Sequence, residues 1–342
     1  MGEFSQWRNE ILETPTPSAI AKLDSVEATL RAQGSPKPYV LIMGSSLMMT
    51  PALFADRQVF NQPSGDINTA YQSYDRFYVL ERAINEAQAN NRPVQVFSLA
   101  APALMISEDT LLLESLLRQR PKPALVVLAL APRDFIDRTV APPMQSPTAQ
   151  LLIERLSPQL WNSKLTIEQN LEILGNRYCF VFRHRSKLRG LLAKTINYLP
   201  DSTNQISVTL QDSRLEAGKL SADLEYYKKR YLPIDEKRWQ HESTSLREFK
   251  QICSRHKIPL ILLAMPITRP NLTLLPKSFL DLYRCQLQAL SKQASRVKFI
   301  DLTQDPAFQQ QDFTDSVHLR AAGAFKLSSA LKQSIIDYLP TN

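Results

Sequence analysis

Two short motifs near opposite ends of the chain contain the residue types of a serine nucleophile and its proton-transfer partners. In the first, Gly44, Ser45 and Ser46 follow an apolar run and lead into a predicted helix. Glycine allows a sharp turn, and the helix amino terminus offers free N–H groups and a positive dipole end beside the Ser46 hydroxyl. Ser46 is therefore a candidate nucleophile. Taken alone, the same pattern also describes an ordinary turn with a helix cap.

The second motif places Asp315 three residues before His318, ahead of a long amphipathic segment. This spacing lets one short turn present both side chains to the same side. An aspartate so placed can accept the imidazole N–H and stabilise the imidazolium that forms when His318 takes the serine proton. The alternative interpretation is a capping aspartate next to a surface histidine.

The elements that must position these side chains alternate between strand and helix. Five short runs are continuously apolar, which is typical of strands covered on both faces of a parallel sheet. These runs are Tyr39–Met43, Val94–Ser98, Leu125–Leu130, Pro259–Ala264 and Val297–Ile300. Apolar residues recur at helical spacing in Tyr74–Ala87, Thr110–Arg118 (with Ser107 as the helix start), Arg238–Cys253, Ser278–Leu290 and Arg320–Leu339. The pattern predicts a three-layer, doubly wound α/β fold with about five parallel strands and a ligand site outside their carboxyl ends.

One stretch interrupts this alternation. Residues 141–235 contain no convincing strand, and Leu151–Leu156 and Ile167–Leu174 have helical spacing, so we expect a helical insertion there. The predicted organisation is an N-terminal helical extension, the first part of the core, the insertion and the second part of the core, at residues 1–36, 37–140, 141–235 and 236–342.

A basic segment lies inside the predicted insertion. Residues 177–194 carry arginines and lysines without an acid, interleaved with aromatic and aliphatic residues. Such a segment fits contact with a membrane surface or a polyanion. It also fits a solvated basic face on an ordinary helix, which is the commoner case.

Composition excludes several functional classes. The chain has 342 residues, of which 44% are hydrophobic and 22% charged, as in an ordinary globular protein. Its three cysteines are odd in number and widely spaced, so we expect them to be reduced and buried. The four histidines lack paired ligand spacing, and we predict neither a metal nor a cofactor. A net charge of +8 favours anionic partners, but no nucleic-acid-binding motif accompanies it, and we expect no such partner.

The sequence also bears on location. No run of about 18 apolar residues occurs, and charged residues are spread through the first forty, which does not fit a transmembrane helix or a secretory signal. The expected location is the cytoplasm, with residues 177–194 as the candidate contact with a membrane surface.

Together, the two motifs resemble those of the SGNH or GDSL hydrolase superfamily. In that family the nucleophile follows the first strand in a Gly-Asp-Ser-Leu block, and an Asp-x-x-His pair precedes the last helix. Gly44 to Leu47 match the first block, and Asp315 and His318 match the last. The resemblance covers residues 37–140 and 236–342, and it implies Ser46, Asp315 and His318 as the catalytic residues.

The intermediate blocks of the family agree in position but not in residue. A glycine whose N–H binds the oxyanion is best matched here by Ala101, which keeps a backbone donor. An asparagine that also points at the oxyanion is replaced by Arg133. Arg133 could supply a charged donor or bind an anionic part of the substrate. Alternatively, it is paired with Asp134 or Asp137 at the strand end.

Two functions from different classes follow from the resemblance. The first is a serine-dependent acyl ester hydrolase or acyltransferase acting on a polysaccharide or glycolipid, because the chain is similar to bacterial proteins of envelope-polymer O-acetylation and D-alanylation and to uncharacterised cyanobacterial relatives. The second is a non-catalytic module that binds a glycan or envelope component or scaffolds an assembly. The triad residues favour the first function, and the lost asparagine favours the second.

Overall fold

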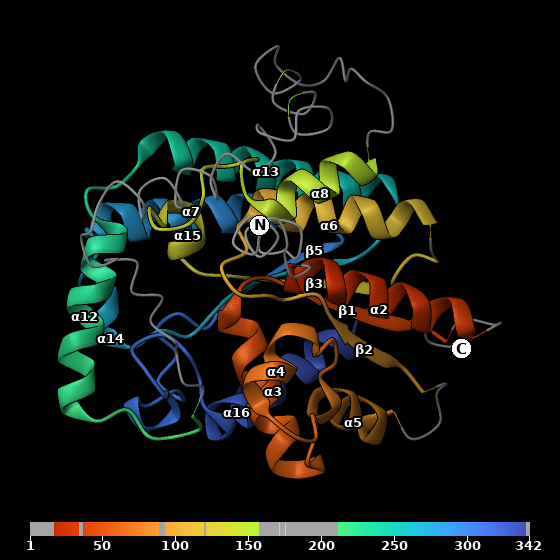
Figure 1. Ribbon diagram of the computed structural model, residues 1–342, viewed down its shortest axis with the longest axis horizontal. Helices are drawn as coiled ribbons and strands as arrows, with labels where there is room; N and C mark the ends of the chain where they lie inside the picture. The colour runs from red at the N-terminus through yellow and green to blue at the C-terminus, as the bar shows by residue number, and fades with distance from the viewer. Residues whose placement is uncertain are drawn as a thin grey trace, which may run out of the picture.

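A five-stranded parallel sheet forms the centre of the computed structural model, in the strand order β2-β1-β3-β4-β5 (Figure 1). The structure describes residues 17–33, 37–88, 93–119, 121–156 and 211–339, together with residues 171 and 175. The predicted α/β fold is confirmed, and each predicted strand is present within one residue at either end. The strands are β1 (Tyr39–Met43), β2 (Gln95–Ser98), β3 (Leu125–Leu130), β4 (Leu260–Ala264) and β5 (Val297–Asp301).

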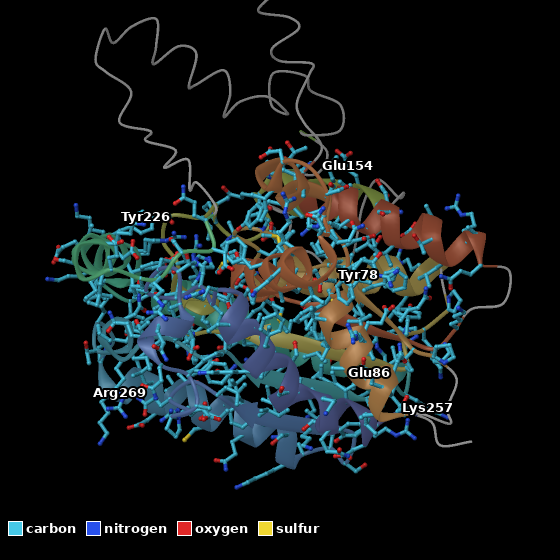
Figure 2. The ribbon with its side chains drawn as sticks, turned by 90° about the horizontal axis from the view of Figure 1, so that it is seen from below. Tyr78, Glu86, Glu154, Tyr226, Lys257 and Arg269 are labelled. Atoms are coloured by element: carbon cyan, nitrogen blue, oxygen red, sulfur yellow. The ribbon has the colours of Figure 1, made fainter. Side chains whose placement is uncertain are left out.

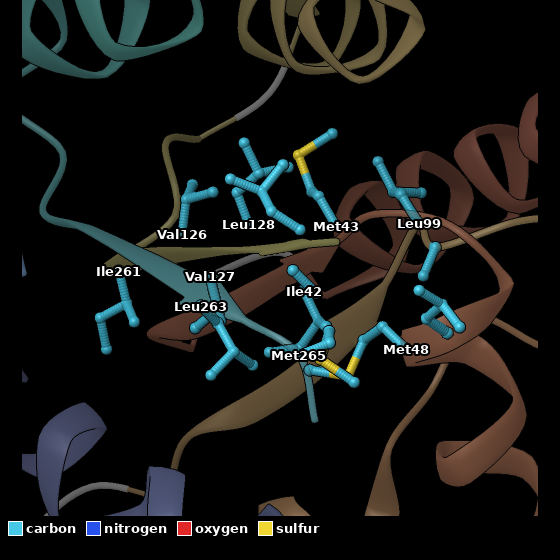
Figure 3. Packing of buried hydrophobic residues seen from close by; sticks show 14 of the residues in the cluster. Ile42, Met43, Met48, Leu99, Val126, Val127, Leu128, Ile261, Leu263 and Met265 are labelled. Carbon is cyan, nitrogen blue, oxygen red and sulfur yellow. The ribbon is translucent and has the colours of Figure 1, made fainter. Parts of the chain in front are cut away.

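The three central strands are apolar because both faces of the sheet are covered. Every residue of β1, β3 and β4 is buried, whereas the edge strand β5 is only partly so. Side chains alternate between the two faces, so that Met43 and Leu128 point to one side and Ile42 and Val127 to the other (Figure 3). This two-sided burial explains why the strands have continuous apolar runs instead of alternating ones.

Helices cover both faces of the sheet. On one side α3, α5 and α16 pack against one another, and on the other α6 packs between α8 and α13 (Figure 1). Helix α15 contacts β5, and α12 lies beside α7 and α14. The helices are α2 (Ser18–Ala32), α3 (Ser46–Phe60), α4 (Ile67–Ser73), α5 (Tyr78–Ala87), α6 (Ile106–Gln119), α7 (Arg133–Ile136), α8 (Pro147–Leu156), α12 (Ala217–Tyr231), α13 (Glu236–Arg255), α14 (Arg269–Leu272), α15 (Lys277–Lys292) and α16 (Ala321–Ile336), with a 3₁₀ turn at Gln310–Asp312.

The carboxyl ends of the strands face the end of the molecule that carries α12 and α14. Lys257 precedes β4 and Arg269 follows it, and these two side chains lie at opposite ends of the molecule, with Tyr226 of α12 on the Arg269 side (Figure 2). The strand order reverses between β1 and β3, the arrangement in which doubly wound proteins place their ligands. The loops after β1 and β3 therefore flank the expected site.

Side-chain hydrogen bonds help to set the starts of two helices, one of which differs clearly from its predicted position. Helix α5 begins at Tyr78 and not near Tyr74, because Asp56 accepts the N–H groups of Tyr78 and Val79, both at 2.7 Å. Helix α6 begins at Ile106, one residue before the predicted start at Ser107, and the N–H and hydroxyl of Ser107 are both bonded to Glu242. The shifted start of α5 arises from a contact between segments that are distant in the sequence.

The structure describes only parts of the predicted N-terminal extension and of the predicted insertion. Helix α2 lies within the predicted N-terminal extension, where Lys22 is buried and donates to the Ala100 carbonyl at 2.6 Å. Helices α8 and α12 lie within the predicted insertion, whereas the basic segment 177–194 falls outside the described residues.

The expectation that all cysteines are buried is wrong for Cys285. Cys253 is buried and free as predicted, but Cys285 is exposed, because it lies on the outer face of α15. Cys179 is outside the described residues. Among the helices that the structure describes, none has the length and apolar character needed to cross a membrane.

The raised pKa of the buried Glu242 carboxyl leads us to expect that the stability of the fold depends on pH. Burial raises its pKa from 4.5 to about 7, although its hydrogen bonds with Ser107 act in the opposite direction. The folded state therefore holds this proton more tightly than the unfolded state, and stability falls as pH rises from 4.5 to about 7. We predict that Glu242→Gln shows a smaller fall of the thermal unfolding midpoint across this window. Glu248→Gln, on the exposed face of the same helix, is the control, and equal pH profiles for the two variants would contradict the prediction.

Candidate active site

The turn after β1 presents Ser46 at the start of α3. Gly44 has a φ of 131°, and a Cβ at this position would lie 2.5 Å from the Ala129 carbonyl oxygen, so only glycine fits. Ser45 is the N-cap residue of α3, and Ser46 is its first residue. The Gly44 N–H donates to Asp109 Oδ1 at 3.2 Å, and this hydrogen bond stabilises the turn. The tight passage of Gly44 past β3 thus fixes where the serine hydroxyl emerges.

Ser46, His318 and Asp315 form a continuous chain of hydrogen bonds. Ser46 Oγ lies 2.9 Å from His318 Nε2, and His318 Nδ1 lies 2.6 Å from Asp315 Oδ2. The two motifs are separated by 272 positions in the sequence, yet the fold brings them into direct contact. This is the geometry in which a histidine takes a serine proton and an aspartate fixes the imidazole.

Asp315 is arranged to remain ionised. Its Oδ1 accepts the N–H groups of Val317 at 2.9 Å and His318 at 2.7 Å. Burial by itself would raise the pKa of Asp315, but the neighbouring His318 and these hydrogen bonds lower it below the usual value. An ionised carboxylate at this place can stabilise a positively charged imidazole.

The loop that carries the aspartate and histidine is held through Ser316, which lies between them. The Ser316 N–H donates to Asp223 Oδ2 at 3.1 Å, and its carbonyl accepts the Thr268 hydroxyl at 2.7 Å. Asn271 Nδ2 donates to Ser316 Oγ at 3.0 Å, and Asn271 in turn accepts the Tyr231 hydroxyl at 3.2 Å. Asp223 and Tyr231 belong to α12, so a helix of the predicted insertion positions the triad.

Tyr71 is a further neighbour of the nucleophile. This residue of α4 has Ser46 and Thr50 among its electrostatic neighbours. Burial raises the pKa of Tyr71 to about 12, so the phenol stays protonated at neutral pH. Tyr71 can therefore act as a neutral hydrogen-bond partner at the site.

The N–H of Ala101 does not have the role that the sequence suggested. It donates to the Gly44 carbonyl at 3.1 Å, which leaves it engaged in joining two loops. Two residues later, Ala103 has a φ of 57°, in the left-handed region that usually takes glycine.

Arg133 is buried directly after β3, with 4% of its surface exposed. Its Nε lies 3.6 Å from Asp134 Oδ1, within the range of an ion pair but beyond that of a hydrogen bond. Asp137 is instead bound by Arg230, through an Nε–Oδ1 hydrogen bond of 3.1 Å and a second contact between Nη2 and Oδ2. Of the two predicted partners of Arg133, Asp134 is therefore the one that forms an ion pair with it, and this ion pair is long.

Metal-ligating side chains do not gather at this site. Across the part of the chain that the structure describes, no group of three or more histidine, cysteine, aspartate or glutamate side chains is arranged to hold a metal ion. The hydrogen-bonded groups at the site are a hydroxyl, an imidazole and a carboxylate.

Comparison with known proteins gives structural likenesses only. No protein-family model matches the sequence. No curated protein matches it either. Among solved structures, the chain is similar to a protein from Streptococcus pneumonia that is described as a platelet activating factor. The sequence identity is 11% and the TM-score is 0.41, over 97% of this chain and 98% of that chain.

The chain is also similar to AlinE4, an esterase of the SGNH-hydrolase family. The identity is 14% and the TM-score 0.35, over 90% of this chain and 99% of the esterase. A serine-to-alanine variant of the same esterase has a TM-score of 0.34 with equal identity and coverage. All three likenesses are low, so the case for function rests on the geometry of the site.

Proposed function

We propose that the protein is a serine-dependent acyl ester hydrolase or acyltransferase of the SGNH type. The observation that carries the proposal is the chain of hydrogen bonds from Ser46 through His318 to Asp315, with distances of 2.9 and 2.6 Å. Each partner plays a distinct chemical part in acyl transfer, and a merely structural histidine would not need both contacts.

In the proposed reaction, Ser46 Oγ attacks the ester carbonyl while His318 Nε2 takes its proton. The tetrahedral intermediate collapses, the ester C–O bond breaks, and the alcohol leaves with the proton from His318. Water or an acceptor hydroxyl, deprotonated by His318, then attacks the acyl-serine. The bond to Ser46 Oγ breaks, His318 returns the proton to Ser46, and the acid or the transferred ester is released. Asp315 stabilises the imidazolium in both half-reactions.

The start of α3 supplies a donor for the oxyanion. The first backbone hydrogen bond of this helix is donated by Met48 to Ser45, so the Ser46 N–H is not used within the helix. Its orientation at the positive end of the helix favours a developing negative charge. In this proposal Ser46 supplies both the nucleophile and one oxyanion donor.

A non-catalytic binding module is the second candidate. It is favoured by the Ala101 N–H, which is engaged with Gly44, and by the replacement of the family asparagine with Arg133. For both candidate functions, we propose a polysaccharide or glycolipid of the cell envelope as the ligand, on the basis of the family resemblance. The basic segment 177–194 is the proposed contact with an anionic surface.

A fluorophosphonate probe separates the two candidates. We expect the probe to label the native chain at Ser46, because only an activated serine attacks phosphorus rapidly. Ser46→Ala should remove the labelling, and Ser45→Ala, at the neighbouring hydroxyl, should keep it. Mass spectrometry of the labelled peptide identifies the site. An unlabelled native chain would favour the binding module.

A further inference from the structure

Arg133 is a buried cation for which the described residues supply no side-chain hydrogen bond at Nε. A guanidinium keeps its charge in proteins and carries five N–H donors. The described residues give Arg133 one ion pair, the 3.6 Å contact with Asp134, and its Nε has no hydrogen-bond partner among them. Burying a charge in this way is unfavourable unless acceptors are supplied. A ligand that brings such acceptors would therefore gain binding energy here.

The neighbouring carboxylates are committed to other partners. Asp137 is bound by Arg230 through both of its oxygens. Asp134 Oδ2 accepts the Ala131 N–H at 2.7 Å, and its Oδ1 makes no hydrogen bond within the described residues. Neither carboxylate forms a two-point pair with Arg133. The fork of the guanidinium thus lacks the planar anionic partner that it fits best.

The fold places Arg133 beside the proposed nucleophile. It follows β3, which pairs with β1 at Leu128 and Met43, so the Ser46 and Arg133 loops flank the same point of the sheet. Tyr71 lies within electrostatic range of both Ser46 and Arg133. Tyr227 of α12 lies within such range of both Arg133 and Asp315. Two phenols, Tyr71 and Tyr227, are therefore electrostatic neighbours of both Arg133 and a member of the triad.

We infer that Arg133 binds an anionic oxygen group, a carboxylate or a phosphate, which the substrate carries next to its scissile ester. The inference rests on the proposed function and narrows its substrate class to anionic acyl esters. A planar fork binds two oxygens of such a group at once, and Tyr71 and Tyr227 add neutral donors around it. This assigns to Arg133 a specificity role at the position where the family has an oxyanion donor.

The first test compares two esters that differ in charge, p-nitrophenyl acetate and p-nitrophenyl hemisuccinate. We expect Arg133→Gln to lower kcat/KM for the hemisuccinate about 10- to 100-fold more than for the acetate. Arg133→Lys, which keeps the charge but loses the fork, should give an intermediate loss and serves if the glutamine variant does not fold. Arg269→Gln removes an exposed charge at the same end of the molecule and should not change the ratio. Equal losses for both esters would overturn the inference.

The second test does not depend on turnover. Succinate, or inorganic phosphate in a parallel series, should raise the unfolding midpoint of Ser46→Ala but not that of Ser46→Ala with Arg133→Gln. A shift that requires Arg133 supports the anion site even if the native chain hydrolyses neither ester, so it separates this inference from the proposed reaction. The absence of any shift with both anions, or an equal shift in the two variants, would overturn the inference.

Discussion

His318→Ala is expected to lower kcat for ester hydrolysis by about 10⁴- to 10⁶-fold. The serine hydroxyl is a weak nucleophile without its base, and His318 Nε2, at 2.9 Å, is the group in contact with it. The imidazole also delivers the proton to the leaving alcohol, so both half-reactions lose their acid or base. Steady-state hydrolysis of p-nitrophenyl hemisuccinate measures the effect. A loss of less than tenfold would contradict the triad.

Non-additivity makes this test specific. If Ser46 and His318 act as one unit, the double alanine variant should retain about the same residual rate as either single variant. His256→Ala is the matched control, because this histidine is exposed and precedes β4 at the opposite end of the sheet. It should keep the native rate. Losses that multiply in the double variant would show that the two residues act separately.

The sequence was sufficient for the parts of the fold that depend on local pattern. Apolar runs predicted all five strands, and in β1, β3 and β4 the runs are continuous because burial on both faces removes the alternation of polar and apolar residues. The two motifs predicted which side chains meet, since loops after parallel strands share one edge of the sheet. Ser46 and His318 could therefore be placed together before their distance was known.

The rest of the site depends on contacts that no local pattern encodes. Tyr71 and Asp223 lie near the triad on helices without a distinctive motif, and only the folded structure shows that Asp223 binds the Ser316 N–H. The N–H of Ala101 was assigned by position, but its direction depends on backbone angles that sequence does not fix, and it points to Gly44. Arg133 could be recognised as unusual, whereas its lack of a two-point partner became apparent from the structure.

A second large effect is expected from a substitution at Gly44, in the turn that positions the Ser46 nucleophile. Gly44→Ala should lower the free energy of unfolding by about 1–3 kcal/mol for the backbone strain of an alanine at positive φ. A further loss of about 1–3 kcal/mol is expected from overpacking, because the new Cβ would lie 2.5 Å from the Ala129 carbonyl oxygen. Together these are a large share of the typical stability of a domain. Chemical denaturation followed by circular dichroism measures the change.

Gly218→Ala is the matched control for this prediction. Gly218 lies near the start of α12, where a Cβ would meet nothing within 4 Å, so the change in unfolding free energy should stay within about 1 kcal/mol. The folded fraction of Gly44→Ala should also react more slowly with the fluorophosphonate, since any relief of the overlap with Ala129 moves the turn that carries Ser46. If Gly44→Ala matched the native chain in both stability and labelling rate, the close approach of β1 and β3 would not position the nucleophile.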